Sequence, residues 1–191
     1  MHLHRSVSTD LPLIVVALDE EAAHLHLGDI PVLVTGAGKV NAAAAVASIL
    51  GQHAPRSIIN VGTAGALSDG LTGIHVISEV RQHDLDDAAL HALTGLHFGA
   101  PITLGGDGPV LATGDVFVDD PAIRARLAQQ ADLVDMEGYA VARAALAADI
   151  PVMLVKMVSD AAGGEALRTW RETVDDCAEQ LGEWLREHLS A

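Results

Sequence analysis

The run Pro12-Leu13-Ile14-Val15-Val16-Ala17 decides the fold class. Its apolar and β-branched residues leave no polar face, so the strand predicted over 13–17 has to be covered on both sides. Central strands of that kind are typical of sheets that contain parallel pairs, in which crossover helices cover the two faces. The run therefore favours an α/β fold.

Similar apolar runs recur along the chain and alternate with helical stretches. Further strands are predicted over 32–35, 57–61, 75–80 and 152–158. Helices are predicted over 39–50, 121–130 and 138–148, from their alanine content and from Pro121 at a first helical position. From Glu165 to Leu189 apolar residues recur at three- and four-residue steps, which indicates a long amphipathic closing helix. We therefore expect one α/β domain over 1–191.

Length and composition limit the possible partners. The 191 residues suit a single domain, and 26 acidic against 11 basic side chains give a formal net charge of −15. Lysine occurs only at Lys39 and Lys156, so nucleic acids and polyphosphates are poor candidates. The single Cys177 predicts no internal disulfide and favours the cytoplasm. No apolar stretch reaches the roughly 20 residues that span a bilayer, so no membrane partner is expected.

Two glycine-rich turns follow predicted strands. The turn over 35–41 has no Ser or Thr after Lys39, as a phosphate loop would, and it has Asn41 where a dinucleotide site has its third glycine. It is interpreted as a tight strand-to-helix turn. The turn over 60–67 would let the backbone approach a ligand, with the Thr63 hydroxyl nearby, and a plain loop is the alternative interpretation. We expect no cofactor.

Three acidic residues stand at or just beyond the ends of predicted strands, namely Glu21, Glu137 and Asp160. Helix N-caps also favour acidic residues in such places, so each taken singly is ambiguous. A carboxylate beside an apolar strand is costly to desolvate, and three in equivalent places favour a shared site. Chemistry that generates a cation would use such a cluster, and cleavage of a glycosidic bond is the obvious example.

Ten histidines raise the question of a metal site. His2 and His4 alternate, as do His24 and His26, and alternating residues of a strand share one face that could bind zinc if a nearby carboxylate completed the site. No third ligand occurs at a helical His-x-x-x-His spacing, so the sequence predicts no metal. The absence of a Gly-x-Ser-x-Gly elbow also speaks against a serine hydrolase.

Read in order, the segments 17–21, 35–43, 60–67, 83–86, 113–118, 134–142 and 155–160 resemble the nucleoside phosphorylase superfamily, and within it the 5′-methylthioadenosine/S-adenosylhomocysteine nucleosidases. The resemblance implies a three-layer α/β/α domain whose mixed sheet is partly barrel-like, and usually a homodimer. It also implies a purine nucleosidase that hydrolyses the N-glycosidic bond of an adenine-type nucleoside, such as methylthioadenosine or S-adenosylhomocysteine, to the free base and a ribose moiety.

The resemblance implies a role for each matching residue. Asp160 would be the general acid at purine N7, and Glu21 would activate the attacking water. Glu137 would hold the ribose hydroxyls, and its charge would favour the developing cation. The remaining substrate-binding residues would be Met136, Phe117, Val118, Thr63, Ser159 and Trp170.

Two alternatives and two departures from the family pattern remain. Phosphorylases need a cationic phosphate pocket, and here the corresponding places hold Asn60 and the acidic 19–21, which favours water over phosphate. A phosphate-dependent phosphorylase and a non-catalytic nucleoside-binding module stay open. Lys156 replaces an arginine of the family, and we expect the helix between the 83–84 loop and Thr113 to be missing, which puts the preference for methylthioadenosine in doubt.

Overall fold

A computed structural model describes residues 1–189 and arranges them as ten strands and six helices. The strands are β1 (His2–His4), β2 (Pro12–Val16), β3 (Val32–Val34), β4 (Ser57–Ala66), β5 (Ile74–Val76), β6 (Glu79–Gln82), β7 (Ile102–Thr103), β8 (Val110–Thr113), β9 (Leu133–Asp135) and β10 (Val152–Asp160). The helices are α1 (Asp19–Ala22), α2 (Lys39–Leu50), α3 (Asp87–Thr94), α4 (Pro121–Leu127), α5 (Gly138–Ala147) and α6 (Ala166–Leu189).

All ten strands form one mixed sheet that branches at β4. The main order is β1-β3-β2-β4-β9-β8-β6-β7, while β10 lies along the other edge of β4 and also pairs with β5. The first half of β4 runs parallel to β2, its last two residues pair antiparallel with β9, and β10 runs parallel to nearly its whole length. The α/β fold with a mixed sheet is confirmed, and within residues 1–189 the sheet does not close into a barrel.

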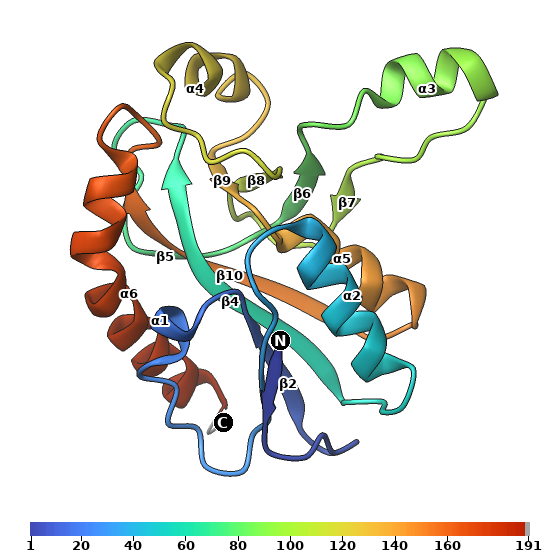
Figure 1. Cartoon of the computed structure of the whole chain (residues 1–191), viewed down its shortest axis with the longest axis vertical. Helices are drawn as coiled ribbons and strands as arrows, with labels where there is room; N and C mark the ends of the chain where they lie inside the picture. The colour runs from blue at the N-terminus through green and yellow to red at the C-terminus, as the bar shows by residue number, and fades with distance from the viewer. Residues whose placement is uncertain (190–191) are drawn as a thin grey trace.

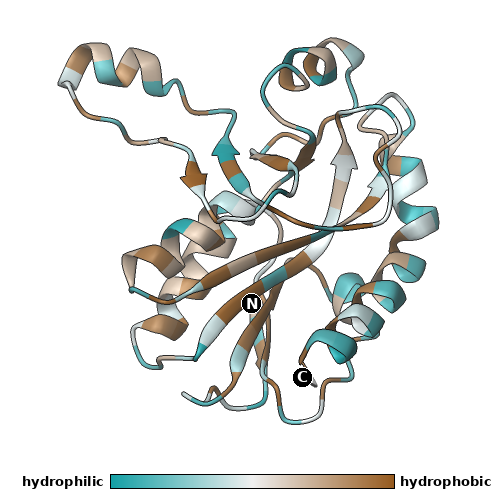
Figure 2. Ribbon diagram, turned by 180° about the vertical axis from the view of Figure 1, so that it is seen from behind, coloured by the Kyte–Doolittle hydropathy of each residue, from teal (hydrophilic) through white to brown (hydrophobic). Residues whose placement is uncertain are grey.

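Helices cover both faces of the sheet, as the apolar run in β2 predicts. Ile14 and Val16 pack in the cluster that includes Leu181 of α6, whereas the alternate residues Leu13 and Val15 pack in the cluster formed with α2 and α5. Figure 1 shows α6 on one side of β4 and β10 and the α2–α5 pair on the other. The central strands are the most continuously apolar part of the ribbon in Figure 2.

The closing helix α6 is amphipathic along its 24 residues. It buries Val174, Cys177, Leu181 and Leu185, while most of its acidic side chains are exposed. Across residues 1–189 no helix combines the length and the apolar character needed to cross a membrane.

The structure corrects two expectations about the middle of the chain. The single strand predicted over 75–80 is two strands, because β5 pairs with β10 on one branch of the sheet and β6 pairs with β7 and β8 on the other. The helix expected to be missing before Thr113 is present as α3. The Asp86 side chain caps it and Gly95 ends it in the left-handed conformation, but it buries none of its residues and protrudes from the body in Figure 1.

Candidate active site

A pocket of about 200 Å³ lies where the carboxyl ends of β2, β9 and β10 meet the second half of β4. This is the edge at which open α/β sheets bind ligands. All nine residues singled out from the sequence line it, namely Asp160, Glu21, Glu137, Met136, Phe117, Val118, Thr63, Ser159 and Trp170. The structure therefore brings together side chains that are spread over 150 positions of the sequence, from Glu21 to Trp170.

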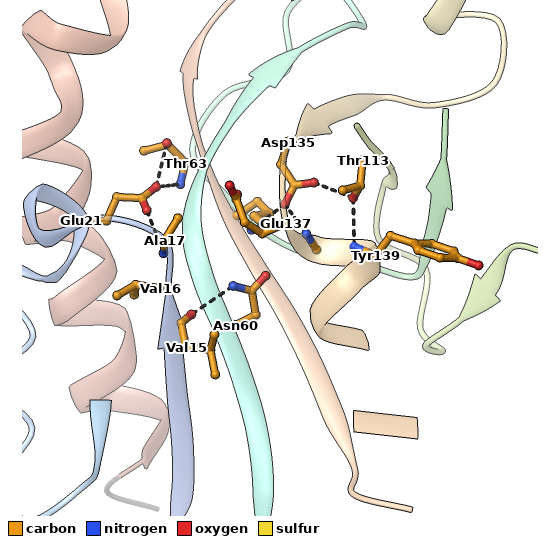
Figure 3. Close-up of polar contacts among 12 residues, drawn as sticks. Val15, Val16, Ala17, Glu21, Asn60, Thr63, Thr113, Asp135, Glu137 and Tyr139 are labelled. Atoms are coloured by element: carbon orange, nitrogen blue, oxygen red, sulfur yellow. Dashed lines mark hydrogen bonds and ion pairs between the residues drawn. The ribbon is translucent and has the colours of Figure 1, made fainter. Parts of the chain in front are cut away.

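Glu21 is a buried carboxylate on the one-turn helix α1, only 5% exposed. Its Oε1 accepts hydrogen bonds from the Thr63 backbone N–H (2.7 Å) and hydroxyl (2.9 Å), and its Oε2 accepts from the N–H groups of Ala17 and Leu18 (3.3 Å each). Figure 3 shows the contacts with Thr63 and Ala17. A Cβ on Gly62 would stand 2.9 Å from Oε1, so the glycine makes room for the carboxylate.

The indole of Trp170, in the first turns of α6, donates a hydrogen bond to the Thr63 hydroxyl at 2.9 Å. A hydroxyl has one hydrogen, and Thr63 gives it to Glu21, so Thr63 has to accept from the indole. Trp170, Thr63 and Glu21 thus form a directed chain of hydrogen bonds. It joins the closing helix to the carboxylate on α1.

Asp160 ends β10 and faces the same pocket. Its Oδ2 accepts from the Ser159 hydroxyl and its Oδ1 from the Ala162 backbone N–H, each at 2.8 Å. A Cβ on Gly65 would lie 3.1 Å from Oδ1 and 3.0 Å from the Ala162 side chain. The segment 60–67, expected to be a turn, continues the strand as the second half of β4. Its glycines serve the two carboxylates: Gly62 leaves space for Glu21, and Gly65 leaves space for Asp160.

Glu137 lies at the N-terminus of α5 and is 9% exposed. Burial, reinforced by the negative charge of Asp135, raises the pKa of Glu137 to about 8, although Lys156 and the Gly38 N–H, which donates to Oε1 at 2.7 Å, act in the opposite direction. Near pH 7 this carboxyl is protonated and can donate as well as accept a hydrogen bond. The expectation that its negative charge favours a cation does not fit that state.

A buried ion pair under the pocket was not among the residues expected from the sequence. Lys156 Nζ lies 2.9 Å from Asp135 Oδ2, which also accepts from the Gly138 N–H at 2.8 Å. Figure 3 shows the contact on the other side of this carboxylate, where Asp135 Oδ1 accepts from the Thr113 hydroxyl at 2.6 Å. Burial by itself would lower the pKa of Lys156, but the carboxyl groups of Asp135 and Glu137 outweigh it and raise that pKa. The sequence feature that could have pointed to this ion pair is the position of Asp135, two residues before Glu137.

The glycine-rich turn before α2 is a tight strand-to-helix turn whose amides serve the chain's own carboxylates. Gly38 donates its N–H to Glu137, and Lys39 donates its N–H to Asp115 Oδ1 at 2.7 Å. The Lys39 ammonium pairs with Asp84 and, at 3.7 Å, with Asp115. The helix terminus that would attract a phosphate is thus occupied by side chains.

Apolar side chains form the remaining walls of the pocket. Val118 is buried, Met136 and Trp170 are half-buried, and Phe117 is 38% exposed at the edge. An apolar pocket with a few convergent polar groups is the usual form of a small-molecule site. The arrangement can hold a flat heterocycle between apolar walls and present carboxyl groups to both sides of a bond.

Known proteins match almost all of the chain. The family described as the phosphorylase superfamily matches residues 20–101 and 81–190. The 5′-methylthioadenosine/S-adenosylhomocysteine nucleosidase of Marinomonas sp. (strain MWYL1) is 32% identical over 187 residues, which cover 84% of this chain and 80% of that protein.

Solved structures share the fold. The nucleosidase of the same description from Helicobacter pylori, complexed with a pyrrolopyrimidine-bearing pyrrolidinol, superposes with a TM-score of 0.85 at 22% identity and covers 96% of this chain and 99% of its own. The futalosine hydrolase of Helicobacter pylori gives a TM-score of 0.84 at 21% identity, with 95% and 98% covered.

Proposed function

The chain belongs to the phosphorylase superfamily and, within it, to the family of the 5′-methylthioadenosine/S-adenosylhomocysteine nucleosidases, and on that premise we propose that its pocket hydrolyses the N-glycosidic bond of an adenine-type nucleoside. The enzyme is an N-ribosyl hydrolase that releases a free base and a ribose moiety. Methylthioadenosine, S-adenosylhomocysteine or a relative is the proposed substrate.

The acidic character of the pocket is the observation that favours hydrolysis over phosphorolysis. Its ionisable lining residues, within the part of the chain that the structure describes, are all acidic, namely Glu21, Asp135, Glu137 and Asp160, with no Lys or Arg among them. Lys156 lies beneath the wall and is paired with Asp135. Such a pocket repels phosphate, favours an oxocarbenium-like transition state, and admits neutral water as the nucleophile.

We assign the two catalytic roles to Glu21 and Asp160. Glu21 takes a proton from water as the water oxygen bonds to the anomeric carbon. The bond between that carbon and the purine nitrogen breaks, its electron pair passes to the base, and Asp160 gives a proton to the base at N7. The backbone and hydroxyl donors around Glu21 keep the accepting carboxylate in place, and Ser159 and Ala162 orient Asp160.

We assign the substrate contacts to the side chains that line the pocket walls. Neutral Glu137 would exchange hydrogen bonds with the ribose hydroxyls, and Met136 would pack against the sugar. Phe117 and Val118 would enclose the base. Trp170 would face the 5′ substituent, and the apolar Leu167, one turn before it on α6, suits a thioether better than a charged group.

The decisive experiment measures base release in phosphate-free buffer from methylthioadenosine, S-adenosylhomocysteine, adenosine and inosine. We expect free adenine from at least one of the adenine nucleosides, and a loss of about a hundredfold or more in both Asp160→Asn and Glu21→Gln. Release that requires added phosphate would instead identify a phosphorylase. Calorimetric binding of adenosine with the intact ligand recovered would identify a non-catalytic binding module.

We also propose that the chain is a single domain that forms a homodimer in the cytoplasm. Leu93, Leu96 and Phe98, on and after the protruding α3, are more than half exposed, which supports a partner on that side. The single free Cys177 is buried, which suits a reducing compartment. Light scattering of the purified chain would test the dimer, and a monomer at micromolar concentration would contradict it.

A further inference from the structure

Away from the pocket, three metal-ligating side chains converge near the start of the chain. His2 and His4 are the outer residues of β1, and Asp19 begins α1. One ligand atom from each lies within 4.8 Å of the other two, and no second group of three His, Cys, Asp or Glu residues meets in this way within residues 1–189. We propose that His2, His4 and Asp19 form a binding site for a divalent transition-metal ion of the Zn²⁺ type.

The sheet order explains why these residues meet. β1 pairs antiparallel with β3, with His2 opposite Val34, and β3 runs parallel to β2. His2 therefore lies at the edge of the sheet where β2 ends and the chain leads to Asp19. Alternate residues of a strand share a face, so His4 stays beside His2. The sequence shows no third ligand near the histidine pair, and the fold supplies Asp19, so this proposal departs from the expectation of no metal.

The three side chains lie in direct contact with one another. His2 Nε2 lies 2.8 Å from Asp19 Oδ1, and the two imidazole rings are edge to face with centroids 4.8 Å apart. An ordinary surface ion pair accounts for His2 and Asp19 alone. The second imidazole is what distinguishes this cluster, because ion binding needs His4 and the ion pair does not.

The donor set selects the class of ion. Two imidazoles and a carboxylate suit Zn²⁺ and neighbouring first-row ions, whereas Ca²⁺ and Mg²⁺ prefer sites built entirely from oxygen. Three protein ligands leave a fourth tetrahedral position for water. All three side chains are exposed, so an ion can reach them without opening the fold. Bound there, it would fasten β1 to the one-turn helix that carries Glu21, two residues after Asp19.

The test uses the full chain without an affinity tag, titrated with Zn²⁺ by calorimetry and against a chromophoric chelator. We expect one ion per chain, no displacement by excess Mg²⁺ or Ca²⁺, and an affinity at least about tenfold weaker in His4→Gln and Asp19→Asn. The exposed His53 lies beyond α2, so His53→Gln serves as the matched control and should bind like the native chain.

The binding measurement is independent of enzyme activity, so failure of this proposal and failure of the nucleosidase proposal can be told apart. Circular dichroism of each variant shows whether it is folded, and the exposure of the three side chains makes folding of all variants the expected result. Absence of stoichiometric Zn²⁺ binding to the native chain would overturn the site. Unchanged affinity in folded His4→Gln would do the same.

Discussion

Replacing Glu137 by glutamine should change how the stability of the protein depends on pH. The folded chain holds the carboxyl proton up to a pKa of about 8, whereas the ordinary value is 4.5. Between those values the folded state binds one proton more than the unfolded state, so the free energy of unfolding falls as pH rises. The contribution of the protonated Glu137 carboxyl to the free energy of unfolding is fully present below about pH 4.5 and is lost as pH rises through 8.

The size of the effect follows from the shift. Each unit of pKa difference corresponds to about 1.4 kcal/mol, so a shift from 4.5 to about 8 gives roughly 5 kcal/mol between acid and alkaline pH. Glu137→Gln resembles the protonated side chain in shape and keeps an acceptor for the Gly38 N–H. It cannot ionise, and its stability should therefore exceed that of the native chain by an amount that grows over this range.

Urea unfolding at a series of pH values from 5 to 9 measures the difference. Glu179→Gln, which removes an exposed carboxylate on α6, is the matched control and should run parallel to the native chain. A constant offset between Glu137→Gln and the native chain at every pH would refute the reasoning, because it would show that the buried carboxyl does not keep its proton on folding.

Three further changes test the contacts of the site. Trp170→Phe keeps an aromatic ring but removes the indole N–H, so kcat for base release should fall about two- to tenfold; an effect on KM alone would mean that the ring only covers the substrate. Gly62→Ala places a Cβ 2.9 Å from Glu21 Oε1 and should lower kcat about a hundredfold, whereas Gly164→Ala, which meets open space, should leave it unchanged. Lys156→Met leaves a buried carboxylate unpaired and should cost about 3–5 kcal/mol in urea unfolding, and a loss below about 1 kcal/mol would contradict that pairing.

Strong local patterns made much of the fold predictable. The apolar run in β2 required cover on both faces, and α2 spans the predicted 39–50 because its alanines favour a helix whatever its neighbours. Short elements escaped prediction, since β7 has two residues and α1 has four. The pairing partner of β7 lies about 20 residues earlier in the chain, in β6, and both elements are too short for a periodicity to mark them.

The site residues were predictable because carboxylates and glycines recur where strands end, in an order that resembles a family. Their contacts were not. Asp135 and Lys156 are far apart in sequence, and their 2.9 Å pairing depends on how β9 and β10 lie around β4. The raised pKa of Glu137 likewise follows from burial, and the sequence alone does not show which carboxyl group is buried away from water.

The split pairing of β4 has a consequence for the order in which the protein folds. One edge of β4 pairs with β2, about 45 residues earlier, and the other edge pairs with β10, about 95 residues later, so the pairing of this strand cannot be completed locally. Such long-range pairing slows folding. During synthesis the pocket can have neither Asp160 nor Trp170 until nearly the whole chain has left the ribosome. A chain that stops before Asp160 therefore lacks the proposed general acid, so base release requires that β10 and the start of α6 have joined the sheet.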